Sequence, residues 1–338
     1  MERWNQYEIL NLNEYNFTFL GTMTSSSKLG LIFNIQRFSI HDGPGIRTTI
    51  FFKGCSLQCF WCHNPEGRQS RPQIQYFPEK CIGCGECLAR CPHQAHAIKD
   101  ELHLYLRELC KNCGTCTETC YSNALELTGK YMTADAVMEE ILRDRMFYET
   151  SKGGVTLSGG EPVLQSQFAS EILKRCKEEE LHTAIETCGN YQWQDLESLL
   201  PVTDLIMMDM KLIDPIKHKS ACGDSNERIL ANAQRLALTN KPIIFRTPIV
   251  PNVNDTYEDV GAIVKFVRNL VELRARHNNG QGEHAEIQFE LLPFHRLASD
   301  KYRSLGMEYR ARNLEPPSKA KMHELAKIAE IHGIEVIG

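Results

Sequence analysis

The chain has 338 residues, of which 42% are hydrophobic and 24% charged, and its net charge is −5. This length suits one large domain with an insertion. The charge gives no general electrostatic reason for nucleic-acid binding, and no apolar run reaches the roughly 18 residues that a membrane-spanning helix needs.

The first 28 residues are predicted to be a loose extension of the folded domain. They are polar and aromatic without a clear period, and they lack the basic start and apolar core of a signal peptide. Met23 could be the natural start of the protein.

Grouped cysteines are the main chemical signal in the chain. Eleven of the fourteen lie between Cys55 and Cys120. Disulfide frameworks belong to short secreted chains, whereas cysteine runs in a large chain indicate metal.

A strand and a tight loop precede the first cysteine group. Residues 29–37 alternate apolar and polar side chains, which predicts a strand. The glycines and proline of Asp42-Gly43-Pro44-Gly45-Ile46-Arg47 predict a defined loop. Taken alone, such a loop is more often an ordinary turn.

Three cysteines follow an apolar run, at Cys55, Cys59 and Cys62. Iron–sulfur clusters are normally held by four thiolates, so three thiolates leave one iron open. An open position is how a metal site meets a substrate. The alternative is a zinc site that His63 completes.

Residues 76–128 contain eight more cysteines and are predicted to form a separate module. The first run is Cys-x2-Cys-x2-Cys-x3-Cys-Pro, as in bacterial ferredoxins, and the second run repeats the spacing. In such pairs the fourth cysteine of each run ligates the other cluster. The predicted ligand sets are Cys81, Cys84, Cys87 and Cys120 for one cluster, and Cys110, Cys113, Cys116 and Cys91 for the other. A zinc ribbon is the competing interpretation.

Six apolar strands can be counted in the remaining chain, mostly separated by helical stretches. They are predicted over 48–53, 154–158, 182–186, 205–210, 243–249 and 286–292, with helices over 133–148 and 319–331 among the stretches that surround them. This alternation implies an α/β fold with parallel strands and helices outside. In folds with parallel strands and helices outside, the chemistry lies at the carboxyl ends of the strands.

Candidate residues recur at those strand ends. Gly159, Gly160 and Glu161 follow the second strand, and glycines allow close backbone approach to a ligand, although such a loop alone is common. Four more candidates are Glu186, Asp209, Lys211 and His295. Asp209 and Lys211 could instead be a buried ion pair that only holds the fold, and a lone histidine more often packs.

Arg246 lies within the fifth predicted strand. A guanidinium offers two parallel donors to a carboxylate. It therefore suits either the carboxyl end of a cofactor or a nearby acidic residue.

Asp-Gly-Pro-Gly-Ile-Arg followed by Cys-x3-Cys-x2-Cys resembles the signature of the enzymes that activate glycyl radical enzymes, within the radical S-adenosylmethionine (SAM) superfamily. The resemblance covers residues 29–338. It implies a partial (β/α)6 TIM-like radical SAM barrel in 29–75 and 129–338, with a ferredoxin-like 2×(4Fe–4S) insertion at 76–128. The implied cofactors are SAM and three 4Fe–4S clusters.

The resemblance also implies roles for individual residues. The residues implied to contact SAM are Asn64, Gly159, Gly160, Glu161, Glu186, Asp209, Lys211, Arg246 and His295. In the pyruvate formate-lyase activator, residues that match Glu186, Thr187, Met207 and Asp209 hold a monovalent cation, with aspartate where this chain has Glu186. The resemblance therefore also implies a monovalent-cation site at these four residues. Asp42 and Arg47 are the candidates for gripping the glycine loop of a partner enzyme.

The implied activity is reductive cleavage of SAM to a 5′-deoxyadenosyl radical, which takes the α-hydrogen of a glycine in the partner. The implied partners are a glycyl radical enzyme and an electron donor such as flavodoxin or ferredoxin, in a reducing, anoxic cytoplasm. Two alternatives remain: a radical SAM enzyme that modifies a peptide or small molecule, and a ferredoxin-type electron carrier. The sequence does not name the partner's substrate.

Overall fold

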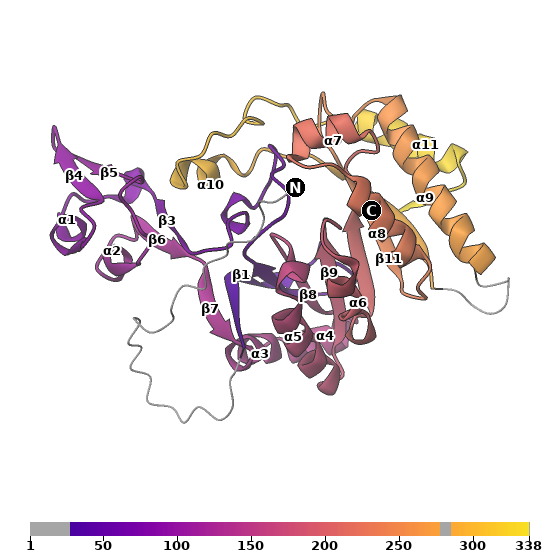
Figure 1. The fold of residues 1–338 in the computed structure, drawn as a ribbon, viewed down its shortest axis with the longest axis horizontal. Helices are drawn as coiled ribbons and strands as arrows, with labels where there is room; N and C mark the ends of the chain where they lie inside the picture. The colour runs from indigo at the N-terminus through magenta and orange to yellow at the C-terminus, as the bar shows by residue number, and fades with distance from the viewer. Residues whose placement is uncertain (1–27, 278–284, 338) are drawn as a thin grey trace, which may run out of the picture.

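The computed structural model describes residues 28–277 and 285–337 (Figure 1). The predicted extension therefore lies outside the described residues, apart from Lys28. Within these ranges no helix is long and apolar enough to cross a membrane.

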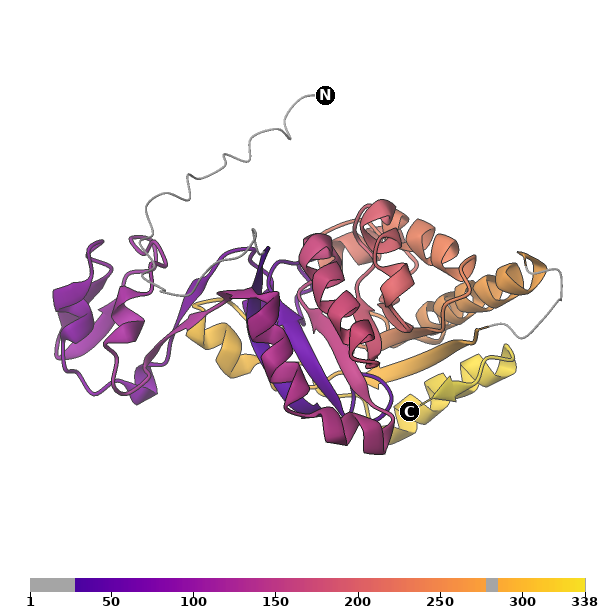
Figure 2. The ribbon, with the colours of Figure 1, turned by 90° about the horizontal axis from the view of Figure 1, so that it is seen from below.

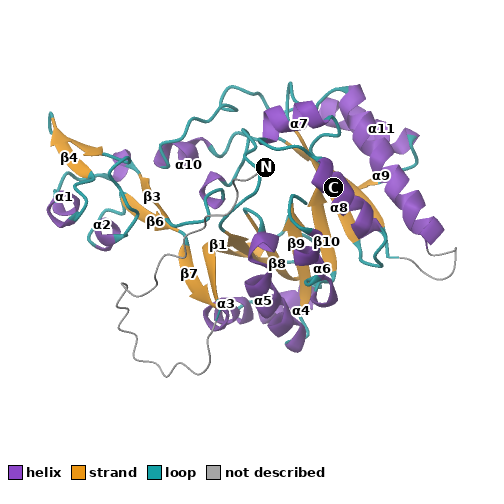
Figure 3. Ribbon diagram, in the orientation of Figure 1, coloured by secondary structure: helices purple, strands orange, loops and turns teal. Residues whose placement is uncertain are grey.

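A nine-stranded sheet forms the centre of the molecule (Figure 3). Its spatial order is β13-β12-β11-β10-β9-β8-β2-β1-β7. The strands are β1 (Leu29–Ser39), β2 (Arg47–Phe52), β7 (Lys130–Thr133), β8 (Gly154–Gly159), β9 (His182–Thr187), β10 (Leu205–Asp209), β11 (Ile243–Ile249), β12 (Ile287–Pro293) and β13 (Val336–Ile337). β2 and the strands from β8 to β13 pair in parallel, whereas β1 and β7 are antiparallel additions at one edge.

The six predicted strands correspond to β2 and β8 to β12, with ends within one residue of those expected. Because they are parallel, their carboxyl ends share one edge of the sheet. The chain thus has an α/β fold with a large, mostly parallel sheet, which confirms the predicted fold class at that level.

Helices cover one face of this sheet (Figure 2). They are α3 (Ala134–Leu142), α4 (Arg145–Ser151), α5 (Ser166–Glu178), α6 (Trp193–Glu197), α7 (Pro215–Cys222), α8 (Glu227–Ala237), α9 (Tyr257–His277) and α11 (Lys319–Ile331). A further helix, α10 (Ser299–Ser304), lies apart from them and contacts the turn at residues 65–67 (Figure 1). The main core joins apolar side chains of α5, α8 and α9 to those of the strands. The prediction of one helix over 133–148 was wrong, because Asp144 interrupts it between α3 and α4. Its buried carboxylate accepts hydrogen bonds from Arg37 and from the Thr48 hydroxyl.

The opposite face of the same strands, here called the polar face, has charged groups near the carboxyl ends and a small apolar cluster of Ala184, Leu205, Met207 and Ile244 behind them. Side chains alternate between the two faces of a strand. Ile185, Met208 and Phe245 belong to the helix-covered core, so their neighbours Glu186, Asp209 and Arg246 lie on the other face. The sheet therefore gathers charged groups near the carboxyl edge of its strands.

Residues 73–128 form a smaller lobe at one end of the molecule (Figure 1). It contains β3 (Gln73–Tyr76) paired with β6 (Leu125–Thr128), and β4 (His96–Lys99) paired with β5 (Leu102–Tyr105). Two short helices, α1 (Glu86–Arg90) and α2 (Thr115–Glu118), each begin after a glycine with positive φ, Gly85 and Gly114. This repetition follows the two cysteine runs of the sequence.

Candidate functional site

The loop that carries Cys55, Cys59 and Cys62 lies directly beyond the carboxyl end of β2. Backbone hydrogen bonds fix it on two sides. The Gly54 N–H donates to the Gly67 carbonyl at 2.7 Å, and the Gln58 N–H donates to the Cys222 carbonyl at 2.7 Å. The three thiols are therefore positioned by the backbone around them.

The chemistry of these thiols suits an iron–sulfur cluster. Burial raises the pKa of Cys62 to about 12, so its thiolate needs a nearby positive charge, which metal ions supply. His63 is not placed as a fourth ligand. Its Nε2 lies 2.8 Å from the His295 carbonyl oxygen, and its ring stacks on His295 at a centroid distance of 3.6 Å. The geometry favours the three-thiolate site over the zinc alternative.

Two further cysteines adjoin this loop, and the sequence analysis had not assigned them. A hydrogen bond to Cys55, together with burial, raises the pKa of the Cys188 thiol well above its usual range. A hydrogen bond to Cys222, together with burial, does the same for Cys59. Neither residue belongs to a cysteine run, but Cys188 directly follows β9, and that position at the carboxyl edge was the available signal.

The Gly159-Gly160-Glu161 loop packs directly on the cysteine loop. The Gly160 N–H donates to the Phe52 carbonyl at 2.8 Å, and the Glu161 N–H donates to the Gly54 carbonyl at 2.7 Å. A Cβ on Gly160 would lie 2.2 Å from the Gly54 oxygen and 2.5 Å from the Gly67 oxygen. Glycine is thus required here for contact between two protein loops.

We expect Gly160→Ala to displace the cysteine loop and to cost about 1–3 kcal/mol of unfolding free energy, as overpacking does. Iron bound at this site and SAM cleavage should both fall. Iron analysis and chemical denaturation after anaerobic reconstitution measure these effects. The matched control is Gly261→Ala in α9, where the nearest atom lies 3.9 Å away. This variant should gain about 0.5–1 kcal/mol and keep its iron. Full iron and wild-type stability in Gly160→Ala would contradict the argument.

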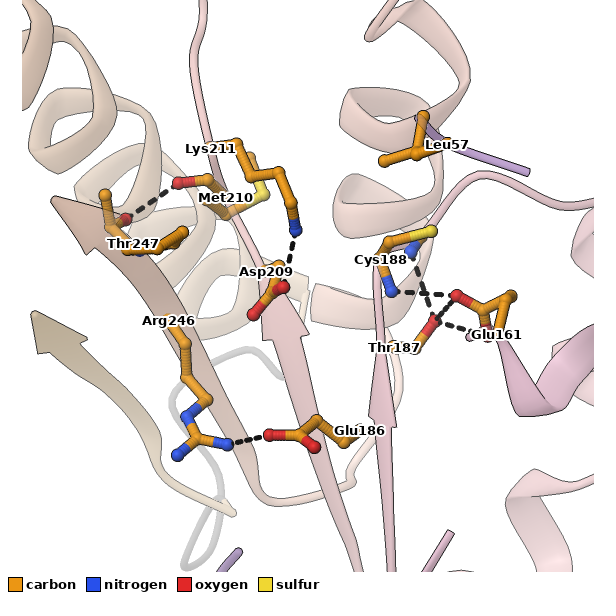
Figure 4. Close-up of polar contacts among 12 residues, drawn as sticks. Leu57, Glu161, Glu186, Thr187, Cys188, Asp209, Met210, Lys211, Arg246 and Thr247 are labelled. Carbon is orange, nitrogen blue, oxygen red and sulfur yellow. Dashed lines mark hydrogen bonds and ion pairs between the residues drawn. The ribbon is translucent and has the colours of Figure 1, made fainter. Parts of the chain in front are cut away.

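The Glu161 side chain points toward the end of β9, and the predicted contact of the Gly159-Gly160-Glu161 loop with SAM stays a prediction. The side chain is fully buried. Its carboxyl oxygens accept hydrogen bonds from the Thr187 hydroxyl at 2.8 and 2.9 Å and from the Cys188 N–H at 2.8 Å (Figure 4). Burial raises its pKa well above the usual range. Glu161 therefore holds the end of β9 in place beside the cysteine loop.

Arg246 joins two carboxylates on the polar face of the sheet. Its Nη1 pairs with Glu186 across β10 (Figure 4), and its Nε donates to Glu290 at 2.7 Å. Its Nη2 donates to the His41 carbonyl at 2.9 Å. All three nitrogens have protein partners. The ion pair with acidic residues, one of the two roles predicted for Arg246, is therefore present, and the contact with SAM stays a prediction.

The same contacts bear on the predicted cation site. Glu186 also accepts a hydrogen bond from the Ser158 hydroxyl, and the Met207 sulfur lies 3.7 Å from Arg246 Nη1. Two residues matched to the monovalent-cation site therefore already contact a cation, the guanidinium of Arg246.

Lys211 forms an ion pair with Asp209 at the end of β10 (Figure 4). Burial lowers the pKa of Lys211, but Asp209 and the neighbouring thiols of Cys59 and Cys188 outweigh this effect, so the pKa is raised. The ammonium group stays charged. It lies where the cysteine loop and the polar face of the sheet meet.

Asn64 and His295 lie at the rim of the cysteine loop. The Asn64 side-chain oxygen accepts a hydrogen bond from Lys301 at 3.0 Å, and Lys301 also pairs with Glu66 at 2.6 Å. His295 is exposed apart from its stacking on His63. Both predicted SAM contacts thus lie beside the three thiols.

The loop from Asp42 to Arg47 folds against the polar face, and its two predicted partner-binding residues differ. Asp42 is half-buried, and its Oδ2 accepts hydrogen bonds from Ser39 at 2.6 Å and Thr49 at 2.7 Å. Arg47 is fully buried, donates to the Val155 carbonyl at 2.6 Å, and has its pKa lowered by burial to about 10. The prediction that Arg47 grips a partner was wrong, because its side chain is used to hold the loop.

The eight cysteines of the lobe line two cavities, four to each. Cys81, Cys84, Cys87 and Cys120 line the first cavity, and Cys91, Cys110, Cys113 and Cys116 line the second. The fourth cysteine of each run therefore faces the other run. Four thiols around one cavity are the donor set of a 4Fe–4S cluster.

Comparisons with known proteins agree with this chemistry. A family model described as "4Fe-4S single cluster domain" matches residues 41–230. The chain is 40% identical over 321 residues to the indoleacetate decarboxylase activating enzyme of Tractidigestivibacter scatoligenes, covering 91% of this chain and 96% of that protein. It is 38% identical over 311 residues to the (2S)-3-sulfopropanediol dehydratase activating enzyme of Klebsiella oxytoca, with 90% and 95% covered.

Other relatives have the same kind of name. The trans-4-hydroxy-L-proline dehydratase activating enzyme of Clostridioides difficile is 38% identical over 305 residues, with 89% of this chain and 96% of that protein covered. Among solved structures, a domain of pyruvate-formate lyase-activating enzyme from Bacteroides vulgatus is 27% identical and covers 55% of this chain and 98% of that chain, with a TM-score of 0.44.

The matched model and these relatives define an iron–sulfur enzyme of the radical SAM superfamily. The chain belongs to the activating enzymes of glycyl radical enzymes. Its activity is reductive cleavage of SAM to methionine and a 5′-deoxyadenosyl radical, which removes the α-hydrogen of a glycine in a partner enzyme.

Proposed function

We propose that Cys55, Cys59 and Cys62 hold the 4Fe–4S cluster at which SAM is cleaved. One observation carries this proposal: the three thiols, the Gly159-Gly160 loop and the Lys211–Asp209 pair meet at one edge of a parallel sheet. The bound cluster supplies an electron and an open iron to SAM.

The surrounding residues act by position and charge. The charged Lys211 ammonium stands beside two thiols and favours their ionised form. Asp209 and the rim residues Asn64 and His295 offer polar contacts to SAM. The guanidinium of Arg246 forms an ion pair with Glu186 and so occupies the place of a positive charge beside this carboxylate. The site therefore works without an added monovalent cation.

We also propose a more specific fold than an α/β fold with a large parallel sheet. The six longer parallel strands, β2 and β8 to β12, have helices on one face and charged groups on the other, which suits a partial (β/α)6 barrel, open on one side. The lobe suits a ferredoxin-like domain with two auxiliary 4Fe–4S clusters, because each of its two cavities has four cysteines. The chain would then carry three clusters.

The partner is a glycyl radical enzyme of the dehydratase, decarboxylase or lyase kind. The relatives named above activate decarboxylases and dehydratases. A reducing cytoplasm with flavodoxin or ferredoxin as electron donor suits the clusters. A primary carbon radical reacts with most C–H bonds nearby, so the partner's glycine loop must close the open side and exclude water.

The proposal is tested with protein reconstituted under anaerobic conditions, reduced with dithionite and mixed with SAM. We expect about twelve irons per chain, four for each cluster, and formation of 5′-deoxyadenosine. A glycyl doublet in electron paramagnetic resonance (EPR) should appear when the right glycyl radical enzyme is added. Deoxyadenosine without a glycyl signal from any candidate would favour a different substrate. Full clusters without deoxyadenosine would favour the electron carrier.

Asp42→Ala should reduce activation of the partner more than it reduces SAM cleavage without partner. Its carboxylate is half-buried near the open side of the sheet, and the hydrogen bonds that it accepts from described residues all reach Oδ2. Parallel assays of glycyl radical yield and deoxyadenosine measure the two effects. The control is Asp135→Ala, an exposed acid on α3, which should change neither. Equal loss of both activities in Asp42→Ala would contradict a role of Asp42 in binding the partner.

A further inference from the structure

The two halves of the lobe are copies of one pattern, and the copies differ at one pair of core positions. Ile74 and His103 stand the same distance before the first cysteine of their runs, and His96 and Leu125 stand the same distance after the last. Ile74 and Leu125 are buried together in an apolar cluster. In the other half the equivalent pair is His103 and His96.

This difference places an imidazole against one set of thiols. His103 Nδ1 lies 3.8 Å from the Cys81 sulfur, and His103 Nε2 lies 3.6 Å from the Cys87 sulfur. Its equivalent Ile74 lines the second cavity, which Cys110, Cys113, Cys116 and Cys91 also line. Hydroxyl contacts occur at both sites, at 3.8 Å for Ser122 on Cys120 and 3.5 Å for Thr115 on Cys113. Among the described residues, an imidazole contacts a cluster-site thiol only at the first cavity.

The second histidine holds the ring of His103 in this position. His96 Nδ1 lies 2.9 Å from His103 Nε2, within hydrogen-bond distance. A metal-bound thiolate accepts hydrogen bonds and does not donate them. Each ring nitrogen of His103 faces one thiol of the first site, so the nitrogen that carries hydrogen points toward a thiol in either tautomer. The pair thus orients an N–H of His103 toward the first site, as a second-shell partner orients a metal ligand.

We propose that His103, held by His96, raises the reduction potential of the cluster bound by Cys81, Cys84, Cys87 and Cys120, so that this cluster takes the first electron of the auxiliary pair. Hydrogen bonds to cluster sulfurs are one of the factors that set such potentials. An N–H dipole stabilises the reduced form, which has one more negative charge. The exposed position of Cys84 adds to the same effect, because solvent exposure is another such factor. The inference rests on the proposed two-cluster function of the lobe.

The test is a redox titration of the full-length holoenzyme followed by EPR. The duplication suggests the variant to test. His103→Ile replaces the histidine with the residue type of Ile74, which stands at the equivalent position of the other half. We expect unchanged iron content, a lower midpoint for one auxiliary cluster and an unchanged midpoint for the other. His103→Gln keeps an N–H donor and should recover part of the shift. His93→Ile is the matched control, because His93 lines the second cavity and has no thiol contact among the described hydrogen bonds.

The possible outcomes distinguish failure of this proposal from failure of the proposed two-cluster function on which it rests. Wild-type midpoints in His103→Ile with full iron would overturn the role of His103. Loss of four irons from both His103 variants would also overturn the proposed role. His103 would then be needed for the cluster to bind, and its effect on the reduction potential could not be the reason for its position. A wild-type protein that binds only about four irons and still cleaves SAM would remove the auxiliary clusters themselves, and the inference with them.

Discussion

Cys59→Ser should reduce SAM cleavage to background while the lobe keeps its iron. Cys59 is one of three thiols in a loop whose backbone is bonded on both sides, and a three-thiolate site has no spare ligand. Iron should fall by about four per chain. Iron analysis, EPR of the reduced protein and chromatography of deoxyadenosine measure the result.

Cys84→Ser is the comparison for this result, because Cys84 lines the first cavity of the lobe. It should lower the iron content without removing the site at which SAM binds, so that cleavage driven by dithionite persists. Persistent cleavage in Cys59→Ser, or its complete loss in both variants with intact fold, would contradict the assignment of separate sites.

Arg246→Met should cost about 3 kcal/mol of unfolding free energy, since breaking a buried ion pair leaves its partners uncompensated. The guanidinium side chain is 5% exposed, and its two carboxylate partners, Glu186 and Glu290, are 24% and 20% exposed. SAM binding should weaken as well, because Arg246 also holds the His41 carbonyl and so the loop that carries Asp42. Denaturant unfolding of the reconstituted protein and a SAM binding titration measure the two effects.

The control for Arg246 is Arg145→Met, which removes exposed ion pairs with Glu149 and Glu179. Exposed pairs contribute about 0–1 kcal/mol. Adding Glu290→Gln to Arg246→Met should recover part of the lost stability, because one uncompensated carboxylate is removed. A double variant less stable than Arg246→Met would show that Glu290 is held by something other than this pair.

The strands and the cysteine sites could be predicted because local patterns encode them. An apolar strand and a fixed cysteine spacing are properties of a few consecutive residues, so the bounds of β2 were predicted to within one residue. Asp144 shows the limit of such patterns. It ends α3 because Arg37 and Thr48, far away in sequence, bind its carboxylate.

Side-chain direction is the part of the site that the sequence did not reveal. Glu161 and Arg47 stand in motifs near the site, yet the structure turns the first toward Thr187 and buries the second under Val155 and Thr156. The direction of each side chain depends on which carbonyl and hydroxyl groups the tertiary structure places within hydrogen-bond distance. Cys188 was missed for the same reason, since only the folded sheet brings it beside Cys55.

The lobe is joined to the rest of the molecule through a two-stranded stem. Gln73 at the start of β3 pairs with Thr128 at the end of β6, so the chain leaves the main sheet and returns to it at neighbouring points. An insertion whose two ends lie close together can be gained or lost in a single genetic event without changing the order or pairing of the strands around it. Joining residue 72 to residue 129 by a short turn would therefore remove the lobe and keep the main sheet with its cysteine loop, so that the chemistry at this loop can be studied apart from the lobe.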